Sequence, residues 1–346
     1  MASKATLEPT ETVVPVQPIQ KDPDILAAAA HLAGEDMCSI ADLSSGEVRA
    51  ILKLGHDVKR NPRQYRHALD AKQMVLMFEK ASLRTRLSFE TGINTMGGNA
   101  IFVDHTSSPL GEREGVADVA KNVERWVDII VRRTYAHDTI TEMAANSRVP
   151  VVNALSDFEH PCQALADFMT LQEHFGSVAG LNFTYLGDGN NVCHSLMLTG
   201  AQLGANVTIA TPRGYSPDIE IVTKAREIAA ANGCDVRLLQ DPQLAAEGAD
   251  AIYTDVCVSM GFEHESTKRA PIFRPFQVNE PLMQKAASHA VFMHCLPARR
   301  NAEVTDSVLD GPQSIVFDQA ENRMHAQKAL LLLLLGGLAN VGAFSC

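Results

Sequence analysis

The chain has 346 residues, of which 46% are hydrophobic and 21% are charged, and its formal net charge is −11. This length predicts two domains, each with room for a buried core, and the composition is ordinary for a globular protein. The acidic balance argues against a nucleic-acid-binding protein, because such proteins present a basic face. An anionic substrate would therefore need a local pocket of arginines.

Seven cysteines are scattered along the chain without CxxC spacing. Their odd number and spacing indicate reduced thiols in a cytoplasmic protein, and neither a disulfide framework nor a zinc site. The N-terminal stretch is rich in Pro and Thr, and it lacks the apolar core of a signal peptide and the Arg bias of a transit peptide. We therefore predict that residues 1–33 form a disordered extension.

Short β-branched runs alternate with helical patterns along the rest of the chain, which indicates an α/β fold. We predict helices over residues 45–59, 88–96 and 160–174. We predict strands over residues 74–78, 100–103, 128–131, 149–153, 182–186, 207–210, 236–239, 251–254, 291–294 and 315–317. This rhythm favours two doubly wound parallel-sheet domains joined by helices, with an active-site cleft between them, and ligands that bind beyond the carboxyl ends of the strands.

The proposed domain boundary lies before the third of these helices. One domain would comprise residues 34–158 together with a C-terminal helix over 320–346, and the other would comprise residues 159–319. Residues 330–335 are a pure leucine run, and together with the residues up to Cys346 this segment approaches the lower limit of a membrane span. Because a Gly-Gly pair and polar residues interrupt the segment, we expect a buried helix there and no membrane partner.

A phosphate-binding pattern follows the first predicted strand, where the chain reads SLRTR over residues 82–86. Helix N-terminal amides, arginine forks and hydroxyl donors together can bind a phosphate at such a strand-to-helix turn. A helix start with solvated arginines is the alternative interpretation. Arg84 and Arg86 are two residues apart and cannot share one helical face, so we expect one of them to be structural.

Polar residues also lie at the ends of later strands and at helix starts. His160 and Gln163 share a helix face, where a His can donate to a carbonyl oxygen and a Gln can bind an amide nitrogen. Asp255 directly follows a strand and could bind a substrate ammonium, Cys295 follows another strand, and Arg323 begins the last helix. Taken singly, His160 could as well be a structural histidine, and the others are more often a turn carboxylate, a core thiol and a solvated charge.

The sequence GDGNN over residues 187–191 matches half of a dinucleotide-binding fingerprint. The third glycine is missing, because position 192 is Val and no glycine follows before Gly200. This gap argues against a Rossmann-type oxidoreductase.

The five motifs SLRTR, HPCQ, DVCVSMG, HCLP and AENR, in this order, resemble those of the transcarbamylase family, and within it the enzymes that act on ornithine. The resemblance covers about residues 36–336. It implies transfer of the carbamoyl group of carbamoyl phosphate to the δ-amine of L-ornithine, which gives L-citrulline and phosphate, in arginine biosynthesis. It also implies a homotrimer that needs no metal or cofactor, with carbamoyl phosphate on the first domain and ornithine on the second.

The resemblance further implies roles for individual residues. Carbamoyl phosphate would be bound by Ser82, Leu83 (through its backbone amide), Arg84, Thr85, Arg133, His160, Gln163 and Arg323. Ornithine would be bound by Asn191, Asp255, Ser259, Met260, Cys295 and Leu296. The catalytic residues among them would be Arg84, Arg133, His160, Asp255 and Cys295.

The sequence departs from the family pattern at two positions. The family usually has Thr where this chain has Leu83, and often has Gln or His, reaching a neighbouring subunit, where this chain has Pro109. These departures leave open a carbamoyltransferase for putrescine or an N-acylated ornithine, and a catalytically silent paralogue. The loop from Asp255 to Met260 favours free ornithine, because an acylated substrate would lack the α-ammonium that the carboxylate binds.

Overall fold

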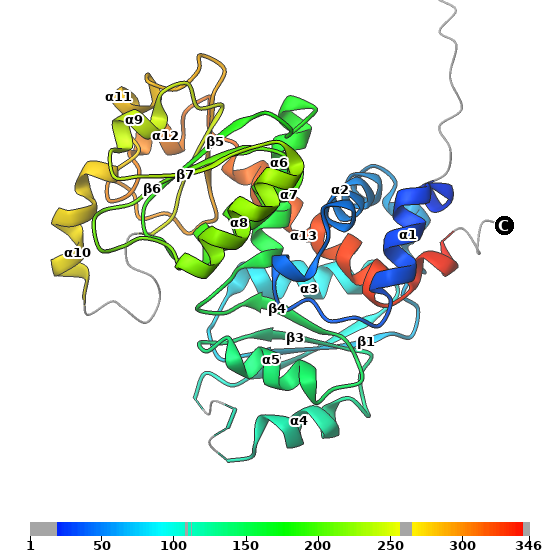
Figure 1. Ribbon diagram of the computed structural model, residues 1–346. Coiled ribbons are helices and arrows are strands. Elements are labelled where there is room, and N and C mark those ends of the chain that lie inside the picture. The colour runs from blue at the N-terminus through cyan, green and yellow to red at the C-terminus, as the bar shows by residue number, and fades with distance from the viewer. Residues whose placement is uncertain (1–18, 108–109, 112, 257–264, 342–346) are drawn as a thin grey trace, which may run out of the picture.

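The computed structural model describes residues 19–107, 110–111, 113–256 and 265–341, and it contains two separate parallel β-sheets (Figure 1). The first sheet has the order β2-β1-β3-β4 and is formed by β1 (Gln73–Phe78), β2 (Asn99–Asp104), β3 (Ile129–Arg133) and β4 (Val151–Leu155). The second has the order β7-β6-β5-β8-β9 and is formed by β5 (Asn182–Leu186), β6 (Asn206–Ala210), β7 (Val236–Leu239), β8 (Ala251–Thr254) and β9 (Val291–His294). The predicted fold class is thereby confirmed.

Helices cover both sheets and connect their strands. They are α1 (Pro23–Leu32), α2 (Ser45–Arg60), α3 (Leu83–Asn94), α4 (Val116–Val123), α5 (Asp138–Ala145), α6 (Pro161–Phe175), α7 (Asn191–Leu203), α8 (Ile219–Asn232), α9 (Pro242–Ala246), α10 (Ser266–Phe273), α11 (Glu280–Met283), α12 (Asp306–Leu309) and α13 (Val316–Leu334). The inner strands β3 and β8 and the edge strand β4 are buried along their whole length, as expected for parallel strands with helices on both faces. The edge strand β2 is partly exposed.

The predicted strand over residues 315–317 is wrong. Ser314 forms only an isolated bridge with Phe292, and the apolar run from Val316 opens α13. A short apolar run is compatible with either a strand or a buried helix, and the helical pattern of the following residues decides here.

The predicted disordered extension over residues 1–33 is also wrong for the part that the structure describes. Residues 23–32 form α1, which is capped by the side chain of Asp22 and begins with Pro23. Ile25 and Leu32 are buried, and α1 packs against α2 and α13. The apolar stripe of this helix therefore orders it on the first domain.

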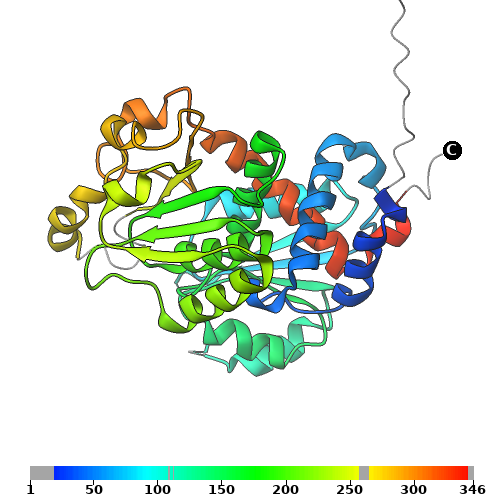
Figure 2. The same ribbon diagram turned by 45° about the horizontal axis from the view of Figure 1, so that its top comes forward.

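The C-terminal helix α13 lies between the two sheets in both ribbon views (Figure 1, Figure 2). It packs against α2 and α3 beside the first sheet, against α6, and against β9 of the second sheet. Its leucines at 330–334 are at most 1% exposed, which confirms the expected buried helix. None of the helices in the described ranges has the length and hydropathy to span a membrane. Residues near the start of α13 are consequently placed between the two sheets.

Candidate active site

The first part of the site forms at the carboxyl ends of β1 and β3. Ser82 is the N-cap of α3: its Oγ accepts a hydrogen bond from the Thr85 amide at 3.2 Å and donates to Thr85 Oγ1 at 2.9 Å. Arg133 ends the neighbouring strand β3, and its guanidinium donates to Thr85 Oγ1 at 3.5 Å and to the Lys80 carbonyl at 3.2 Å. The N-terminus of α3 thus meets an arginine that a different strand supplies.

Arg323 reaches the same point from α13. Its Nη2 donates to Thr85 Oγ1 at 3.1 Å and lies 3.4 Å from His160 Nε2, and its Nη1 donates to Gln163 Oε1. His160 and Gln163 stand at the start of α6, where the backbone amide of His160 donates to Ser195 Oγ at 2.9 Å. Three segments that are far apart in sequence therefore meet at the Thr85 hydroxyl, and α6 is joined to them through Arg323.

The electrostatics of this cluster favour an anion. Arg133 is 5% exposed, and burial together with repulsion from Arg323 and Arg84 lowers its pKa to about 9, which leaves it charged at neutral pH. Burial likewise lowers the pKa of Arg323. Burial, followed by the charges of Arg323 and Arg133, holds the pKa of His160 well below its usual value. The imidazole is therefore neutral beside two cations that an anionic ligand would neutralise.

A cavity of about 310 Å³ opens beside this cluster. It is lined by Leu83, Arg84, Leu87, Ser88, Thr91, Gln163, Cys295, Ala320, Glu321, Arg323 and Met324. Leu83 is 72% exposed, so the residue that departs from the family pattern contributes an apolar side chain to the cavity wall. Residues next to both sheets line the cavity: Arg84 belongs to the helix that follows a strand of the first sheet, and Cys295 follows a strand of the second sheet.

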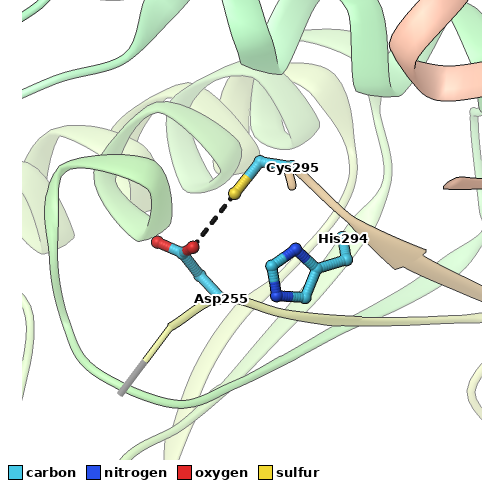
Figure 3. A group of neighbouring side chains, drawn as sticks. All are labelled: Asp255, His294 and Cys295. Carbon is cyan, nitrogen blue, oxygen red and sulfur yellow. Dashed lines mark hydrogen bonds between the residues drawn. The ribbon is translucent and has the colours of Figure 1, made fainter. Parts of the chain in front are cut away.

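The second part of the site lies at the carboxyl ends of β8 and β9. Asp255 and Cys295 follow these neighbouring strands, and the thiol donates to Asp255 Oδ1 at 3.0 Å (Figure 3). Asn190, the N-cap of α7, donates to Asp255 Oδ2 at 2.9 Å. Burial, and then the carboxylate of Asp255, raises the pKa of Cys295 well above its usual value, so the sulfur is a protonated donor in this pair.

Asp255, His294 and Cys295 each offer a ligand atom, and these atoms lie within 4.8 Å of one another (Figure 3). Metal binding would require the deprotonated thiol, which burial disfavours. It would also compete with the amide of Leu296, which donates to His294 Nδ1 at 2.8 Å, and with Glu303, which lies 3.3 Å from Nε2. The donor set of this group fits hydrogen bonding better than metal coordination.

Some predicted site residues stand apart from these contacts. Asn191 donates to the Ser156 carbonyl at 2.6 Å, and its neighbour Asn190, which we did not predict, is the residue that contacts Asp255. The position of Asn190 as the N-cap of the helix that follows β5 was the available signal for it. Leu296 adopts a left-handed backbone with φ of 54° next to Cys295. Ser259, Met260 and Pro109 lie outside the described residues.

Comparison with known proteins matches both halves of the chain to one family. Residues 35–173 match the carbamoyl-P binding domain, and residues 179–334 the Asp/Orn binding domain, of aspartate/ornithine carbamoyltransferase. The ornithine carbamoyltransferase of Pyrococcus horikoshii is 48% identical over 309 residues, which are 89% of this chain and 98% of that protein. That of Mycolicibacterium smegmatis is 51% identical over 85% of this chain and 96% of its own length.

A solved structure agrees with these relatives. The ornithine carbamoyltransferase of Pyrococcus furiosus superposes with a TM-score of 0.86 at 47% identity, over 88% of this chain and 98% of that chain. The motifs that carried the resemblance therefore lie within a match that spans both domains. The chain belongs to the aspartate/ornithine carbamoyltransferase family.

Proposed function

We propose that this protein transfers the carbamoyl group of carbamoyl phosphate to the δ-amine of L-ornithine, giving L-citrulline and phosphate. The observation that carries the proposal is the single cavity that Arg84, Gln163 and Arg323 share with Cys295, which in turn contacts Asp255. Relatives that are named ornithine carbamoyltransferase, and that share 48% and 51% of aligned residues with this chain, support the proposal. Residues 34–158 with 320–346 would then bind carbamoyl phosphate, and residues 159–319 would bind ornithine.

In this proposal the phosphate of carbamoyl phosphate lies at the N-terminus of α3. The hydroxyl groups of Ser82 and Thr85 and the backbone amide of Leu83 would donate to its oxygens, and Arg84 would neutralise its charge. Such a ligand would take over hydrogen-bonding capacity that Ser82 and Thr85 now direct at each other.

The carbamoyl group would lie between α6, α13 and the end of β3. Arg133, His160 and Arg323 would donate to or polarise its carbonyl oxygen, and Gln163 would accept from its nitrogen. The buried Arg133 can do this without a change in protonation, since its pKa stays at about 9. In a water-excluded site, one such preorganised donor contributes about 3 kcal/mol to transition-state stabilisation.

Ornithine would lie at the carboxyl ends of β8 and β9. Asp255 and Cys295 are proposed to hold the amine, with Asn191, Ser259, Met260 and the Leu296 carbonyl completing the site. In the reaction, the lone pair of the neutral δ-amine attacks the carbamoyl carbon and forms a C–N bond. The C–O bond to phosphate then breaks, phosphate leaves with the electron pair of that bond, and the proton lost by the amine passes to the departing phosphate. The holding of both substrates in one cavity supplies the proximity that this step needs.

A colorimetric assay for ureido products tests this proposal. The purified protein would be given carbamoyl phosphate with ornithine, putrescine, N-acetylornithine or aspartate in turn. Fast turnover confined to ornithine is the expected result. Turnover confined to another amine would identify a different carbamoyltransferase, and no turnover with any of them would favour a catalytically silent paralogue.

We further propose that the protein acts in the cytoplasm, in arginine biosynthesis, as a homotrimer that uses no metal or cofactor. The five cysteines that the structure describes are all free thiols, which supports a reducing compartment. Light scattering of the purified protein measures the assembly, and activity after dialysis against a chelator measures the metal requirement.

A further inference from the structure

A buried chain of side-chain amides connects the two parts of the site through Asp167. Asp167 lies on α6 one turn after Gln163 and is fully buried. Its Oδ1 accepts two hydrogen bonds, from Gln163 Nε2 at 2.6 Å and from Gln319 Nε2 at 2.7 Å. Gln319, at the start of α13, in turn accepts from the backbone amide of His294 at 3.0 Å. The chain therefore runs from the residue that lines the cavity to the strand that ends beside Cys295.

The direction of every hydrogen bond in this chain is fixed by its two ends. The guanidinium of Arg323 can only donate, so the atom of Gln163 that faces it must be the oxygen. The backbone amide of His294 can also only donate, so the atom of Gln319 that faces it is the oxygen as well. Both amide nitrogens are thereby turned toward Asp167, where an acceptor is required.

We propose that Asp167 is a positioning residue that fixes the side-chain amide of Gln163 with its oxygen toward the cavity, and that it thereby makes the site select acyl phosphates whose carbonyl carbon bears an –NH2 group. A flipped Gln163 would turn its nitrogen toward the donors of Arg323 and would leave Asp167 without one of its two donors. The ionised carboxylate disfavours that alternative, because it can accept and cannot donate. Burial raises the pKa of Asp167 to about 7, but a proton carried on Oδ2 would still leave Oδ1 as the acceptor that faces both glutamines.

This inference rests on the proposed function and adds the source of its acyl-group selectivity. Gln163 Oε1 accepts from Arg323 and retains a second lone pair, which can accept an N–H of a carbamoyl group. An acyl phosphate with a methyl group in place of the –NH2 group would leave this oxygen facing an apolar group. Sites that are built to hydrogen-bond a substrate reject the analogue that lacks the bonding group.

Two competitive inhibitors measure this selectivity directly. Phosphonoacetamide carries the –NH2 group, and acetonylphosphonate carries a methyl group in its place. The wild-type protein is expected to bind the amide more tightly. Asp167→Leu is expected to reduce the ratio of the two inhibition constants about tenfold, because Gln163 would no longer be held in one orientation. Asp167→Asn is expected to keep the ratio, since its amide oxygen can still accept from both glutamines.

Thr170→Val provides the matched control. Thr170 is a buried residue three positions further along α6. Its hydroxyl donates to the Ala166 carbonyl at 2.7 Å and accepts from Asn322 Nδ2 at 3.0 Å, and these bonds involve neither Gln163 nor Gln319. It is expected to keep the inhibitor ratio even if the melting temperature falls. If Asp167→Leu does not fold, Asp167→Ser serves the same comparison, because its hydroxyl is too short to reach the amide.

The outcomes separate this inference from the proposed function. Loss of the amide preference in Asp167→Leu, with rescue by Asn, supports the positioning role. An unchanged ratio in a folded Asp167→Leu protein, or loss of the preference in the Asn variant as well, would overturn it. Absence of turnover with carbamoyl phosphate and ornithine in the wild-type protein would instead overturn the proposed function.

Discussion

Replacement of Arg323 by methionine should lower activity strongly without a loss of stability. The Arg323 guanidinium contacts Thr85, Gln163 and His160, and it is placed to donate to the carbamoyl group. Removal of one preorganised donor costs about 3 kcal/mol of transition-state stabilisation. This corresponds to a fall in kcat/KM of about two orders of magnitude.

The same change should leave the fold intact or make it more stable. Arg323 is buried beside Arg133, whose pKa is lowered by burial and then by the charge of Arg323. A lowered pKa in a base means that the folded state disfavours its charged form, so removal of the neighbouring cation relieves the folded protein. Methionine preserves most of the apolar stem of the arginine, and therefore most of its packing.

Two measurements and a control decide this prediction. Steady-state kinetics with carbamoyl phosphate gives kcat/KM, and thermal unfolding gives Tm. Arg86→Met is the control, because Arg86 is exposed, pairs with Glu90 at 2.9 Å and does not line the cavity. The reasoning is refuted if Arg323→Met keeps wild-type kcat/KM, or if its Tm falls by several degrees while its activity falls only in proportion to the folded fraction.

Three other changes test separate parts of the molecule. Asp255→Ala should lower kcat about 100-fold or more while the KM for carbamoyl phosphate changes little. The reason is that this carboxylate, which accepts a hydrogen bond from Cys295, is proposed to bind the amine. Unchanged kcat in a steady-state assay would contradict this. Glu79→Ala should lower the free energy of unfolding in urea by about 3–5 kcal/mol, because it leaves the fully buried Arg132 without its ion-pair partner. A loss of unfolding free energy below about 1 kcal/mol would refute the argument. Burial raises the pKa of Glu159 to about 7. The protonated side chain therefore contributes fully to the unfolding free energy below the unfolded-state pKa of the group, and this contribution is lost as the pH rises toward 7. Glu159→Gln should flatten this part of a plot of unfolding free energy against pH, and an unchanged slope would contradict the argument.

The sequence allowed most of the fold to be predicted, because parallel strands and their helices leave strong local patterns. Nine strands lie where β-branched runs stand between helical patterns, with shifts of one or two residues at their ends. The two failures have different causes. The helix over residues 23–32 depends on burial of Ile25 and Leu32 against α2 and α13, and the local pattern contains little information about that packing. The apolar run at Val316 is the first turn of α13, and a run this short is compatible with a strand or a buried helix.

The site was predictable in its composition and less so in its connections. Thr85, Gln163 and Arg323 were each expected near carbamoyl phosphate, and the structure joins them through hydrogen bonds. What no motif indicated was the support behind them. Asp167 and Gln319 are 152 residues apart, and they meet only because α13 packs against α6.

This difference has a physical origin. A residue that binds ligand at the end of a strand can be predicted from its position, because strand ends and helix starts can be recognised in the sequence. A residue that orients such a side chain is an ordinary polar position on a buried helix face, and it is defined only by the donor that packing brings to it. Asn190 illustrates the same point at smaller scale: a shift of one position, from Asn191 to Asn190, separates a contact with the Ser156 carbonyl from a contact with Asp255. Prediction of supporting residues therefore requires the packing of α6, α7 and α13, and it is at such residues that selectivity among similar substrates can be set without any change in the motifs.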